Sequence, residues 1–528
     1  MLHFTYGPIL HLYDKMKEIN CITEKSKLID SYTLITDKVP VSVNIWDCPN
    51  ESIPIYHIKF PNIGLGTQAF LNSLKEEITR GIPLRNELMT DPKIAKKIKL
   101  DYYKKLKSSI AEKLPDISKE KLELFSGITL HKMHGLGDLE IILGDNLLEE
   151  VTINGSKEPI SIYHKKHGWC KTILYPENEE EIYNISALIG RNIGKDITNL
   201  NPIMDAHLLT GDRVASTLFP ISTSGNTITI RRFARTPWTI THFISPEYNT
   251  MTSEMAAILW QAMQYELNII VAGGTASGKT SVLNTLSSFI PPTQRIISVE
   301  DTREISLPKP LHWNWVPMSS RTSNIEGQGE ISMLDLIIAS LRMRPDRMIV
   351  GEIRKQEQAQ ALFEAMHTGH SIYSTMHADT AQQVKRRLTE PPMNIPLVEV
   401  SSLHLILVQY RDRRKGIRRT MELTEVMPAT GETSKLELNT LYRWLPRKDQ
   451  FEKVNSPIRI IDELNLHTGM TVKEINDDLN QKVSILNWLK KEKVYNIDDL
   501  GNILKTYYKE PDKLIKAVNN KWKIEKVI

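Results

Sequence analysis

The chain has 528 residues, which is too long for one ordinary hydrophobic core and indicates several domains. Its 67 basic and 63 acidic residues leave a formal charge of +4. This nearly balanced charge argues against a nucleic-acid coat protein, which carries a strong positive excess. The three cysteines include no CxxC pair, so they build neither a disulfide framework nor a four-cysteine zinc site. No run approaches the roughly 18 apolar residues of a membrane-spanning helix, and the start does not resemble a signal peptide, so we expect a cytoplasmic protein.

Residues 1–125 are predicted to form an N-terminal extension. The pattern is mixed up to about residue 68 and carries no motif, so it indicates no function. From Leu71 to Phe125 it becomes charged, with the periodicity of helices.

Residues 126–235 are predicted to form an α+β N-terminal domain. Strand-like segments at 149–155, 159–164 and 169–175 include a hairpin, and further strands are expected at 213–219 and 226–233. Between them, Asn178 and Glu181 have the spacing of a capping box at the start of a helix. Residues 236–250 contain two prolines and are predicted to be a linker.

Residues 251–427 alternate between short apolar strands and helices. This order is typical of a parallel sheet that is buried on both faces, and it predicts an α/β, RecA-like P-loop domain. Residues 428–528 are predicted to be helical, with Thr471 and Glu474 opening one amphipathic helix.

A phosphate-binding loop is predicted between a strand and a helix of this RecA-like domain. The motif G-x-x-x-x-G-K-[ST] is filled by Gly273, Gly274, Thr275, Ala276, Ser277, Gly278, Lys279 and Thr280. Glycines let backbone N–H groups turn toward the phosphates, Lys279 neutralises their charge, and Thr280 offers its hydroxyl to Mg²⁺. The sequence therefore predicts ATP and Mg²⁺ as cofactors.

Acidic residues follow two of the predicted strands. Glu352 ends the strand that starts at Arg347, where it can face the metal, although a surface salt bridge is the alternative. Glu300, Asp301 and Glu304 follow another strand and are candidates for orienting the attacking water, unless they form only a solvated loop. We favour Glu304, since it lies one turn farther from the strand end.

Histidines stand at both ends of one predicted strand, His367 and His370 before it and His377 after it. A metal site would need a third partner, which the spacing does not offer, so sensing of the γ-phosphate or bridging to a neighbouring subunit fits better. A histidine with only structural hydrogen bonds is the alternative.

Arginines of the preceding domain are candidates for fingers on the transition-state charge, with ordinary surface arginines as the alternative. They are Arg213, Arg231, Arg232 and Arg235. A basic run over residues 411–419 lacks aromatic residues for base stacking and is predicted to be a hairpin turn. Contact of that turn with an acidic partner or with lipid head groups stays open.

Four motifs occur in a fixed order: GGTASGKT, SVEDTRE, RPDRMIVGEIR and AMHTGHSIYSTMHAD. Over about residues 130 to 430 the chain resembles the type II/type IV secretion ATPase superfamily, whose Walker A, Asp box, Walker B and His box follow this order. RRLTEPPMNIP and VQYRDRRKGIRR resemble the archaeal branch, which powers the archaellum and type IV pili. The four-cysteine zinc module of many bacterial members is missing.

The resemblance implies roles for individual residues. Lys279 would be the Walker A lysine and Glu352 the Walker B glutamate. The other roles would be Asp-box acids at Glu300, Asp301 and Glu304, His-box histidines at His370 and His377, and arginine sites at Arg213, Arg231 and Arg232.

The resemblance also implies a homohexameric motor. ATP would lie between the N-terminal and RecA-like domains, which would rock about the linker near Pro237. Its partners would be a polytopic membrane platform protein and pilin-like subunits, with the ring held at the inner face of the membrane. Two alternatives are a ring that translocates nucleic acid, which is not expected without stacking aromatics, and a nucleotide-gated structural ring, which intact Lys279 disfavours. Archaellum, adhesive pilus and secretion pseudopilus all stay open.

Overall fold

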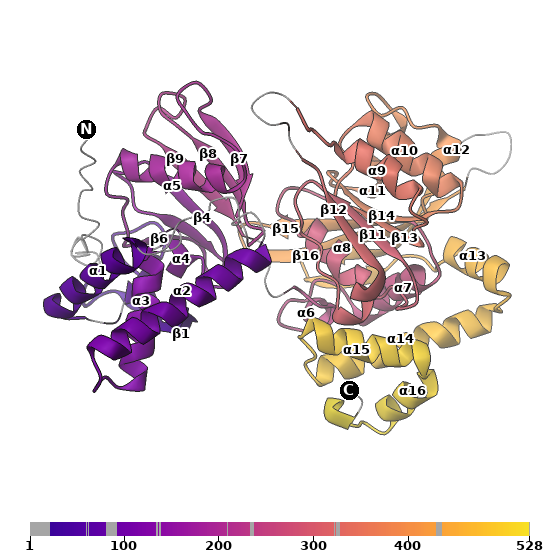
Figure 1. Ribbon diagram of the computed structural model, residues 1–528. Helices are drawn as coiled ribbons and strands as arrows, with labels where there is room; N and C mark the ends of the chain where they lie inside the picture. The colour runs from indigo at the N-terminus through magenta and orange to yellow at the C-terminus, as the bar shows by residue number, and fades with distance from the viewer. Residues whose placement is uncertain are drawn as a thin grey trace. The chain divides into compact units, whose positions relative to one another are not determined.

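The computed structural model describes residues 22–59, 61, 63–80, 92–133, 136, 139–208, 210–232, 237–321, 323, 328–428 and 436–526. It divides the chain into two compact units, Met1–Arg235 and Thr236–Ile528 (Figure 1). The division falls where the predicted α+β domain gives way to the predicted linker.

The first unit is built on a nine-stranded sheet with the order β1-β2-β3-β6-β5-β4-β9-β8-β7. Strands β1 to β3 come from the predicted N-terminal extension, and β3 pairs in parallel with β6, so the unit runs across the predicted boundary at residue 125. The strands are β1 (Lys27–Thr36), β2 (Val39–Asp47), β3 (Ile55–Lys59), β4 (Leu148–Asn154), β5 (Ser161–His164), β6 (Gly168–Thr172), β7 (Ile203–His207), β8 (Arg213–Thr217) and β9 (Thr227–Arg231).

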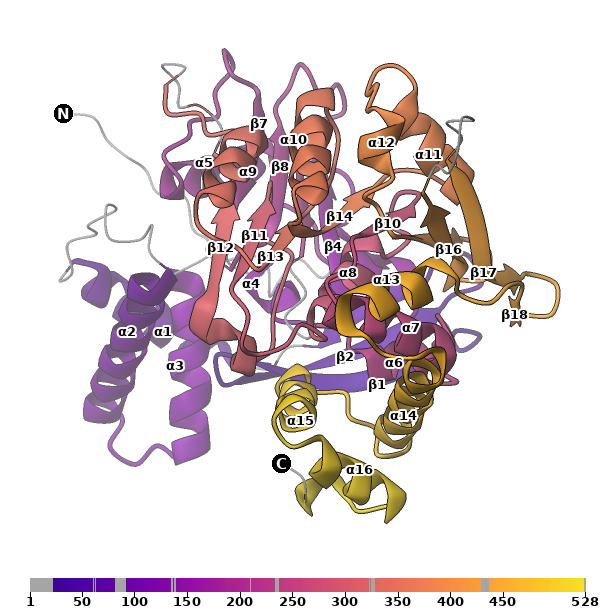
Figure 2. The ribbon, with the colours of Figure 1, turned by 90° about the vertical axis from the view of Figure 1, so that its right-hand side faces the viewer.

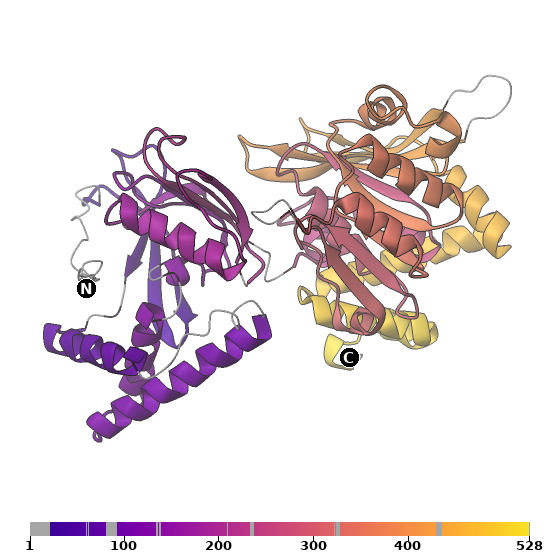
Figure 3. The same cartoon turned by 45° about the horizontal axis from the view of Figure 1, so that its top comes forward.

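Helix α5 (Glu179–Asn192) lies across the strands of this sheet (Figure 3). Its first turn is capped as predicted, because Oδ1 of Asn178 accepts a hydrogen bond of 2.8 Å from the backbone N–H of Glu181. Ile182 and Ile189 are buried against the sheet. The other helices of the unit are α1 (Leu65–Arg80), α2 (Pro92–Lys113), α3 (Lys119–Met133) and α4 (Leu139–Ile142).

The second unit is built on another nine-stranded sheet, with the order β12-β11-β13-β14-β10-β15-β16-β17-β18. Strands β10 to β15 pair in parallel, and β10, β11, β13 and β14 are buried along their whole length. This confirms the predicted RecA-like α/β fold. The strands are β10 (Ile269–Gly273), β11 (Ile296–Glu300), β12 (Trp315–Ser319), β13 (Arg347–Val350), β14 (Ser371–Met376), β15 (Leu405–Asp412), β16 (Ile417–Met427), β17 (Glu437–Leu445) and β18 (Gln450–Lys453).

Helices cover both faces of this sheet, and each face has its own apolar core (Figures 1 and 2). One core lies under α7 (Ser253–Gln264) and α8 (Lys279–Ser287), and the other under α9 (Met333–Leu341), α10 (Gln356–His367) and α11 (Ala381–Thr389). Among the described residues, no helix is long and apolar enough to cross a membrane. The remaining short elements are α6 (Ile240–Ile244), which lies in the predicted linker, α12 (Leu397–Val400) and the 3₁₀ helices η2 (Lys309–Asn314) and η3 (Ile524–Lys526).

The C-terminal region begins with β17 and β18, which continue the sheet, and is helical only after them. The predicted capping box of α14 is present, since Oγ1 of Thr471 accepts from the backbone N–H of Glu474 at 3.3 Å. Helix α14 packs on α7, where the fully buried Lys482 lies 5.6 Å from the ring of Trp260. The helices are α13 (Arg459–Thr468), α14 (Val472–Lys491), α15 (Ile497–Lys509) and α16 (Pro511–Asn519).

Candidate nucleotide-binding site

The loop between β10 and α8 has, at two glycines, a backbone conformation that other residues rarely adopt. Gly273 has a φ of +152°, and a Cβ there would lie 2.4 Å from the carbonyl oxygen of Gln409 on the neighbouring strand. Gly278, the N-cap of α8, has a φ of +94°. The loop therefore wraps closely over the carboxyl end of β10 and leads into the N-terminus of α8, which attracts anions.

Lys279 is the first residue of α8, and its side chain folds back over the loop. It is 8% exposed, and its Nζ donates a hydrogen bond of 2.9 Å to the carbonyl oxygen of Gly274. The same nitrogen lies 3.3 Å from Nδ1 of His377. A buried ammonium beside a helix N-terminus provides two positive features at one point, which suits a phosphate chain.

His377 joins Lys279 to Glu352. It follows β14, the neighbour of β10 in the sheet, and its Nε2 lies 3.1 Å from Oε1 of Glu352. Burial and the charge of Lys279 lower the pKa of His377. A neutral imidazole accepts from Lys279 at Nδ1 and donates to Glu352 at Nε2, so the three side chains form one hydrogen-bonded chain across the sheet edge.

Arg354 joins the two groups of acids, and the sequence reasoning missed it. Its Nε and Nη2 lie 2.8 and 2.7 Å from Oε2 of Glu352, and its Nη1 lies 2.6 Å from Oδ2 of Asp301. The guanidinium thus forms a fork on the Glu352 carboxylate and a bridge to Asp301. A basic residue two positions after Glu352 was the available signal, but its partner Asp301 follows a different strand, β11.

Glu300 is buried beneath the loop that follows β11. Its Oε1 accepts hydrogen bonds from the backbone N–H groups of Glu304 and Ile305 at 2.8 and 2.9 Å. Its Oε2 is buried and has no hydrogen-bond partner among the described residues. The two backbone hydrogen bonds hold the loop in place. Burial raises the pKa of Glu300 to about 7, so this carboxyl is partly protonated near neutral pH.

Asp301 lies in a bend directly after Glu300, and Glu304 lies in a segment without regular secondary structure. The helical turn expected to carry Glu304 outward is absent, so that reason for favouring Glu304 was wrong. Oδ1 of Asp301 accepts from the hydroxyl of Ser320 at 3.0 Å, while Glu304 is half-buried.

His370 lies at the amino end of β14, whereas the phosphate-binding loop follows the carboxyl end of the parallel strand β10. Its Nδ1 lies 3.3 Å from the carbonyl oxygen of Ala365 in the preceding helix. The structure therefore brings His377, and not His370, to Lys279. The nearby His367 has its Nδ1 3.4 Å from the hydroxyl of Ser402.

Arg213 and Arg231 lie opposite each other on β8 and β9 of the first unit. Arg213 forms a two-pronged ion pair with Asp205, with Nε–Oδ1 and Nη2–Oδ2 distances of 3.1 and 2.5 Å. Arg231 is exposed and lies opposite Glu150 of β4. Both arginines therefore lie on the face of the sheet opposite the buried α5 side.

Arg232 has a different environment from its two neighbours. Its Nη1 donates to the backbone carbonyl of Asp145. The Asp145 carboxylate in turn accepts hydrogen bonds of 2.6 and 2.7 Å from the hydroxyls of Tyr32 and Tyr56. Arg232 is thus held within its own unit, and Arg235 lies outside the described residues.

The basic run forms the predicted hairpin, because β15 and β16 pair antiparallel around it. Arg418 reaches from this hairpin to the phosphate-binding loop, where its Nε donates to the carbonyl oxygen of Ala276 at 3.2 Å. Its Cδ would lie 3.6 Å from a Cβ on Gly278. The hairpin therefore supports the outer side of the loop.

A pocket of about 340 Å³ opens over the phosphate-binding loop. It combines loop backbone, His377 and two arginines of α11, so cationic groups predominate around the point where Lys279 lies. These residues fit the phosphates of ATP, and Thr280 and Glu352 are the oxygen ligands that Mg²⁺ would use. The lining residues are Gly273, Gly274, Thr275, His377, Ala378, Asp379, Gln383, Arg386 and Arg387.

Comparison with known proteins agrees with this site. Residues 209–420 match the family model described as type II/IV secretion system protein. An uncharacterized protein of the archaeon Methanocaldococcus jannaschii is 32% identical over 400 residues, which cover 75% of this chain and 71% of the relative. Another from the same organism is 40% identical over 248 residues, covering 47% of this chain and 90% of the relative.

Among solved structures, the ATPase DotB of Legionella pneumophila is 17% identical, with a TM-score of 0.39, and the match covers 72% of this chain and 94% of DotB. The residues matched by the family model include the phosphate-binding loop, the acidic strand ends and His377. The chain belongs to the type II/type IV secretion ATPase family.

Proposed function

We propose that this chain hydrolyses Mg·ATP and uses the energy as one subunit of a hexameric motor for an archaeal type IV pilus-like or archaellum filament. The observation that carries the proposal is the chain of side chains from Lys279 through His377 to Glu352 at the carboxyl edge of the parallel sheet. Ligands of open α/β sheets bind at this edge.

The residues of the site would divide the work of hydrolysis. Mg·ATP supplies the phosphoryl group and the metal that balances its charge. Lys279 would exchange its contact with the Gly274 carbonyl for the β- and γ-phosphates, while Thr280 and Glu352 would hold the metal. His377 contacts both Lys279 and the Glu352 carboxylate. Loss of the γ-phosphate would therefore change the hydrogen bonds of His377 and, through them, the position of Glu352.

The acidic loop after β11 would place the attacking water. Glu300 is occupied with two backbone N–H groups and would act by holding the loop, which leaves Asp301 and Glu304 to face the nucleotide. Arg354 would keep Asp301 next to Glu352. Asp301, which is bonded to Arg354 and Ser320, and Glu304 are the two candidates for this role, and Glu304 remains the favoured one, as in the sequence-based hypothesis.

The motor function rests on family membership and on relatives from an archaeon. In the proposed homohexamer, Arg213 and Arg231 would close over the nucleotide from the exposed face of the first unit's sheet. Closure and opening about the segment near Pro237 would transmit force to a polytopic membrane platform protein and its pilin-like subunits. The ring would work at the cytoplasmic face of that membrane.

The test of the enzyme is Lys279→Ala. We expect ATP hydrolysis to be lost, while the far-UV circular dichroism spectrum and the melting temperature without nucleotide stay close to those of the unchanged protein. The matched control is Lys453→Ala, an exposed lysine on β18, which should hydrolyse normally. Full turnover in Lys279→Ala would refute the assignment.

The test of the ring is light scattering with a non-hydrolysable ATP analogue, which should yield a hexamer. Arg231→Ala should lower turnover more than nucleotide affinity, because an interfacial arginine acts mainly on the transition state. A monomer that hydrolyses ATP at the full rate after dilution would contradict a shared site.

A further inference from the structure

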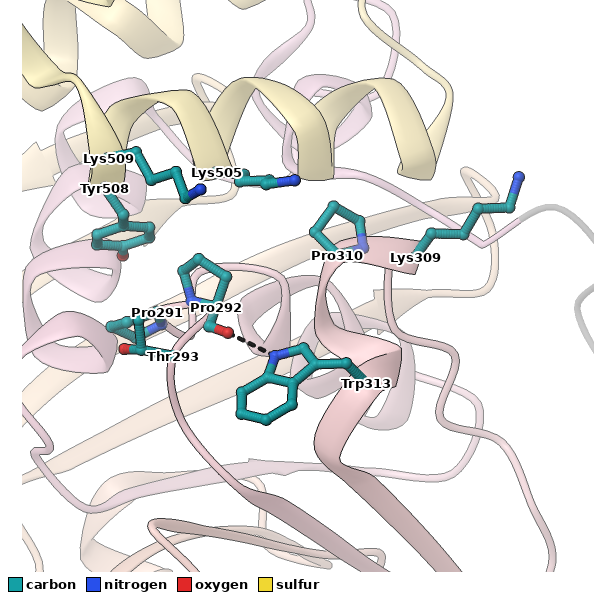
Figure 4. Close-up of a pocket in the computed structure, with 9 residues that line it drawn as sticks. All are labelled: Pro291, Pro292, Thr293, Lys309, Pro310, Trp313, Lys505, Tyr508 and Lys509. Atoms are coloured by element: carbon teal, nitrogen blue, oxygen red, sulfur yellow. Dashed lines mark hydrogen bonds between the residues drawn. The ribbon is translucent and has the colours of Figure 1, made fainter.

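The second unit has a larger pocket, of about 510 Å³, which shares no lining residue with the pocket over the phosphate-binding loop (Figure 4). Three chain segments form it: the loop after α8 at Pro291 and Pro292, the 3₁₀ helix η2 with Trp313, and α15. The loop and η2 directly precede β11 and β12, so the pocket lies at the amino edge of the parallel sheet. ATP binding and hydrolysis therefore do not account for it.

The walls of this pocket are fixed by hydrogen bonds to backbone atoms. The indole N–H of Trp313 donates to the carbonyl oxygen of Pro292 at 2.6 Å, as Figure 4 shows. The hydroxyl of Tyr508 donates to the carbonyl oxygen of Phe289 at 2.5 Å and accepts from Nε1 of Trp260 at 2.9 Å. A cavity held in this way loses little entropy when it is filled.

Helix α15 also packs closely on the segment before Trp313. A Cβ on Gly501 would lie 2.4 Å from Cβ of Pro308, so only glycine lets α15 come this near. Lys309, the first residue of η2, bonds to Asp498 of α15 through its backbone N–H and its Nζ, both at 3.0 Å. These contacts set the width of the pocket.

One large apolar side chain remains exposed in this rigid frame. Trp313 is 63% exposed, although its N–H is satisfied, and the prolines beside it also present apolar surface. A ring held open to solvent next to prolines is typical of sites that bind proline or aromatic side chains of a peptide.

The charged side chains that line the pocket near Trp313 are all lysines. Lys505 and Lys509 are exposed and lie one turn apart on the pocket side of α15, so they repel each other, and neither forms an ion pair with any residue that the structure describes. Lys309 adds a third ammonium at the rim, which is already paired with Asp498, and among the described residues no carboxylate lines the pocket. An acidic ligand would relieve the repulsion between Lys505 and Lys509 and would pair with both of them.

We infer that this pocket binds an acidic peptide segment of a partner protein, with a proline or aromatic side chain of the segment on Trp313 and its carboxylates on Lys505 and Lys509. The occupant is a short chain segment, because a pocket of this size takes a ligand of drug-like dimensions and not a folded surface. Docking at the edge opposite the nucleotide would leave ATP hydrolysis undisturbed.

The test uses an array of short peptides with a central tryptophan, phenylalanine or proline, flanked either by aspartate and glutamate or by lysine. Binding of the full-length chain is measured by fluorescence polarisation. We expect the acid-flanked peptides to bind at least about tenfold more tightly than their lysine-flanked counterparts. Equal binding of the two sets would overturn the inference.

Variants then assign the binding to this pocket. The double variant Lys505→Glu with Lys509→Glu should bind acidic peptides at least about tenfold more weakly. The control is Lys516→Glu with Lys523→Glu, which changes two exposed lysines outside the pocket and should leave the affinity for these peptides nearly unchanged. Trp313→Ala should lose the preference for a central aromatic or proline, and Trp313→Phe should retain most of it. Unchanged binding in both pocket variants would overturn the assignment.

Two further measurements separate other occupants. If phosphatidylglycerol vesicles bind through Lys505 and Lys509 while the peptides show no charge preference, the partner is a membrane and the peptide proposal fails. If the pocket variants alter self-association in light scattering instead, the occupant is a second copy. Lys279→Ala should bind the peptides normally, so a failure of the enzyme proposal stays distinct from a failure here.

Discussion

His377 donates to Glu352, its Nε2 lying 3.1 Å from Oε1 of that carboxylate, and its other nitrogen faces Lys279. The second His-box residue, His370, lies at the other end of the same strand. Strand β14 thus separates two histidines that the sequence motif presents together. Their substitution by alanine should have unequal consequences.

We expect His377→Ala to slow ATP hydrolysis by roughly 10- to 100-fold with a smaller effect on nucleotide affinity, because it removes a link between the lysine and the carboxylate. His370→Ala is the matched control and should keep turnover within about threefold, since its ring hydrogen-bonds to the Ala365 carbonyl at the other end of β14 from Lys279. Steady-state kinetics of both variants decides the matter. Equal losses would show that distance from Lys279 does not determine the role.

Arg354 should be sensitive even to a conservative change. Lysine carries the charge but lacks the planar fork, so Arg354→Lys cannot hold Glu352 at two nitrogens and reach Asp301 as well. We expect kcat to fall about tenfold in Arg354→Lys and in Arg354→Gln, with KM changed much less. Arg303→Gln, an exposed arginine of the same acidic segment, is the control. A wild-type kcat in Arg354→Lys would show that only a positive charge is needed at this position, and not the planar guanidinium.

Glu300 should affect stability and not chemistry. Because its pKa is raised to about 7, the folded state keeps a proton that the unfolded state releases near pH 4.5. The contribution of Glu300 to stability is therefore full below that pH and is lost as the pH rises toward 7, by on the order of 3 kcal/mol.

Glu300→Gln should remove this slope in urea denaturation between about pH 5 and about pH 8, because the amide mimics the protonated carboxyl. Its turnover should stay near that of the unchanged protein. Glu304→Gln should behave in the opposite way, with an unchanged slope and hydrolysis slowed by orders of magnitude. Slow hydrolysis in Glu300→Gln together with normal loop stability would transfer the water-positioning role to Glu300.

Arg232 should prove structural. Its alanine variant leaves the Asp145 carbonyl without that donor, so we expect a loss of about 1–3 kcal/mol in the free energy of unfolding. Arg231→Ala removes an exposed side chain from the adjacent position and should stay within about 0.5 kcal/mol. Chemical denaturation of the two variants gives the comparison, and equal stability would contradict it.

The parts that local chemistry decides were predictable from the sequence. The phosphate-binding loop depends on glycines whose backbone conformation is found at Gly273 and Gly278, and the cap of α5 depends on Asn178 alone. The apolar strands of the RecA-like domain indicated a sheet buried on both faces, and all of β10 and β13 is buried. In each case the signal lies within a few residues of the feature.

The parts that depend on pairing between distant segments were not predictable. Strand β3 joins the sheet through its parallel contact with β6, over a hundred residues later in the chain, so the extension showed no sign of belonging there. Arg354 meets Asp301 only because β11 and β13 are neighbours in the sheet. The sequence around Asp301 or Arg354 does not show that these two side chains pair.

The last hundred residues are attached to the sheet of the second unit in two ways. Strands β16 to β18 extend this sheet, and the buried Lys482 of α14 lies against Trp260 of α7. A chain shortened after Met427 would leave one side of β16 without its hydrogen-bonding partner and would uncover Trp260 to water. Open strand edges and bared tryptophans promote precipitation. A recombinant fragment containing the second unit should therefore retain the chain through α15. Limited proteolysis should yield no soluble fragment that ends near residue 428.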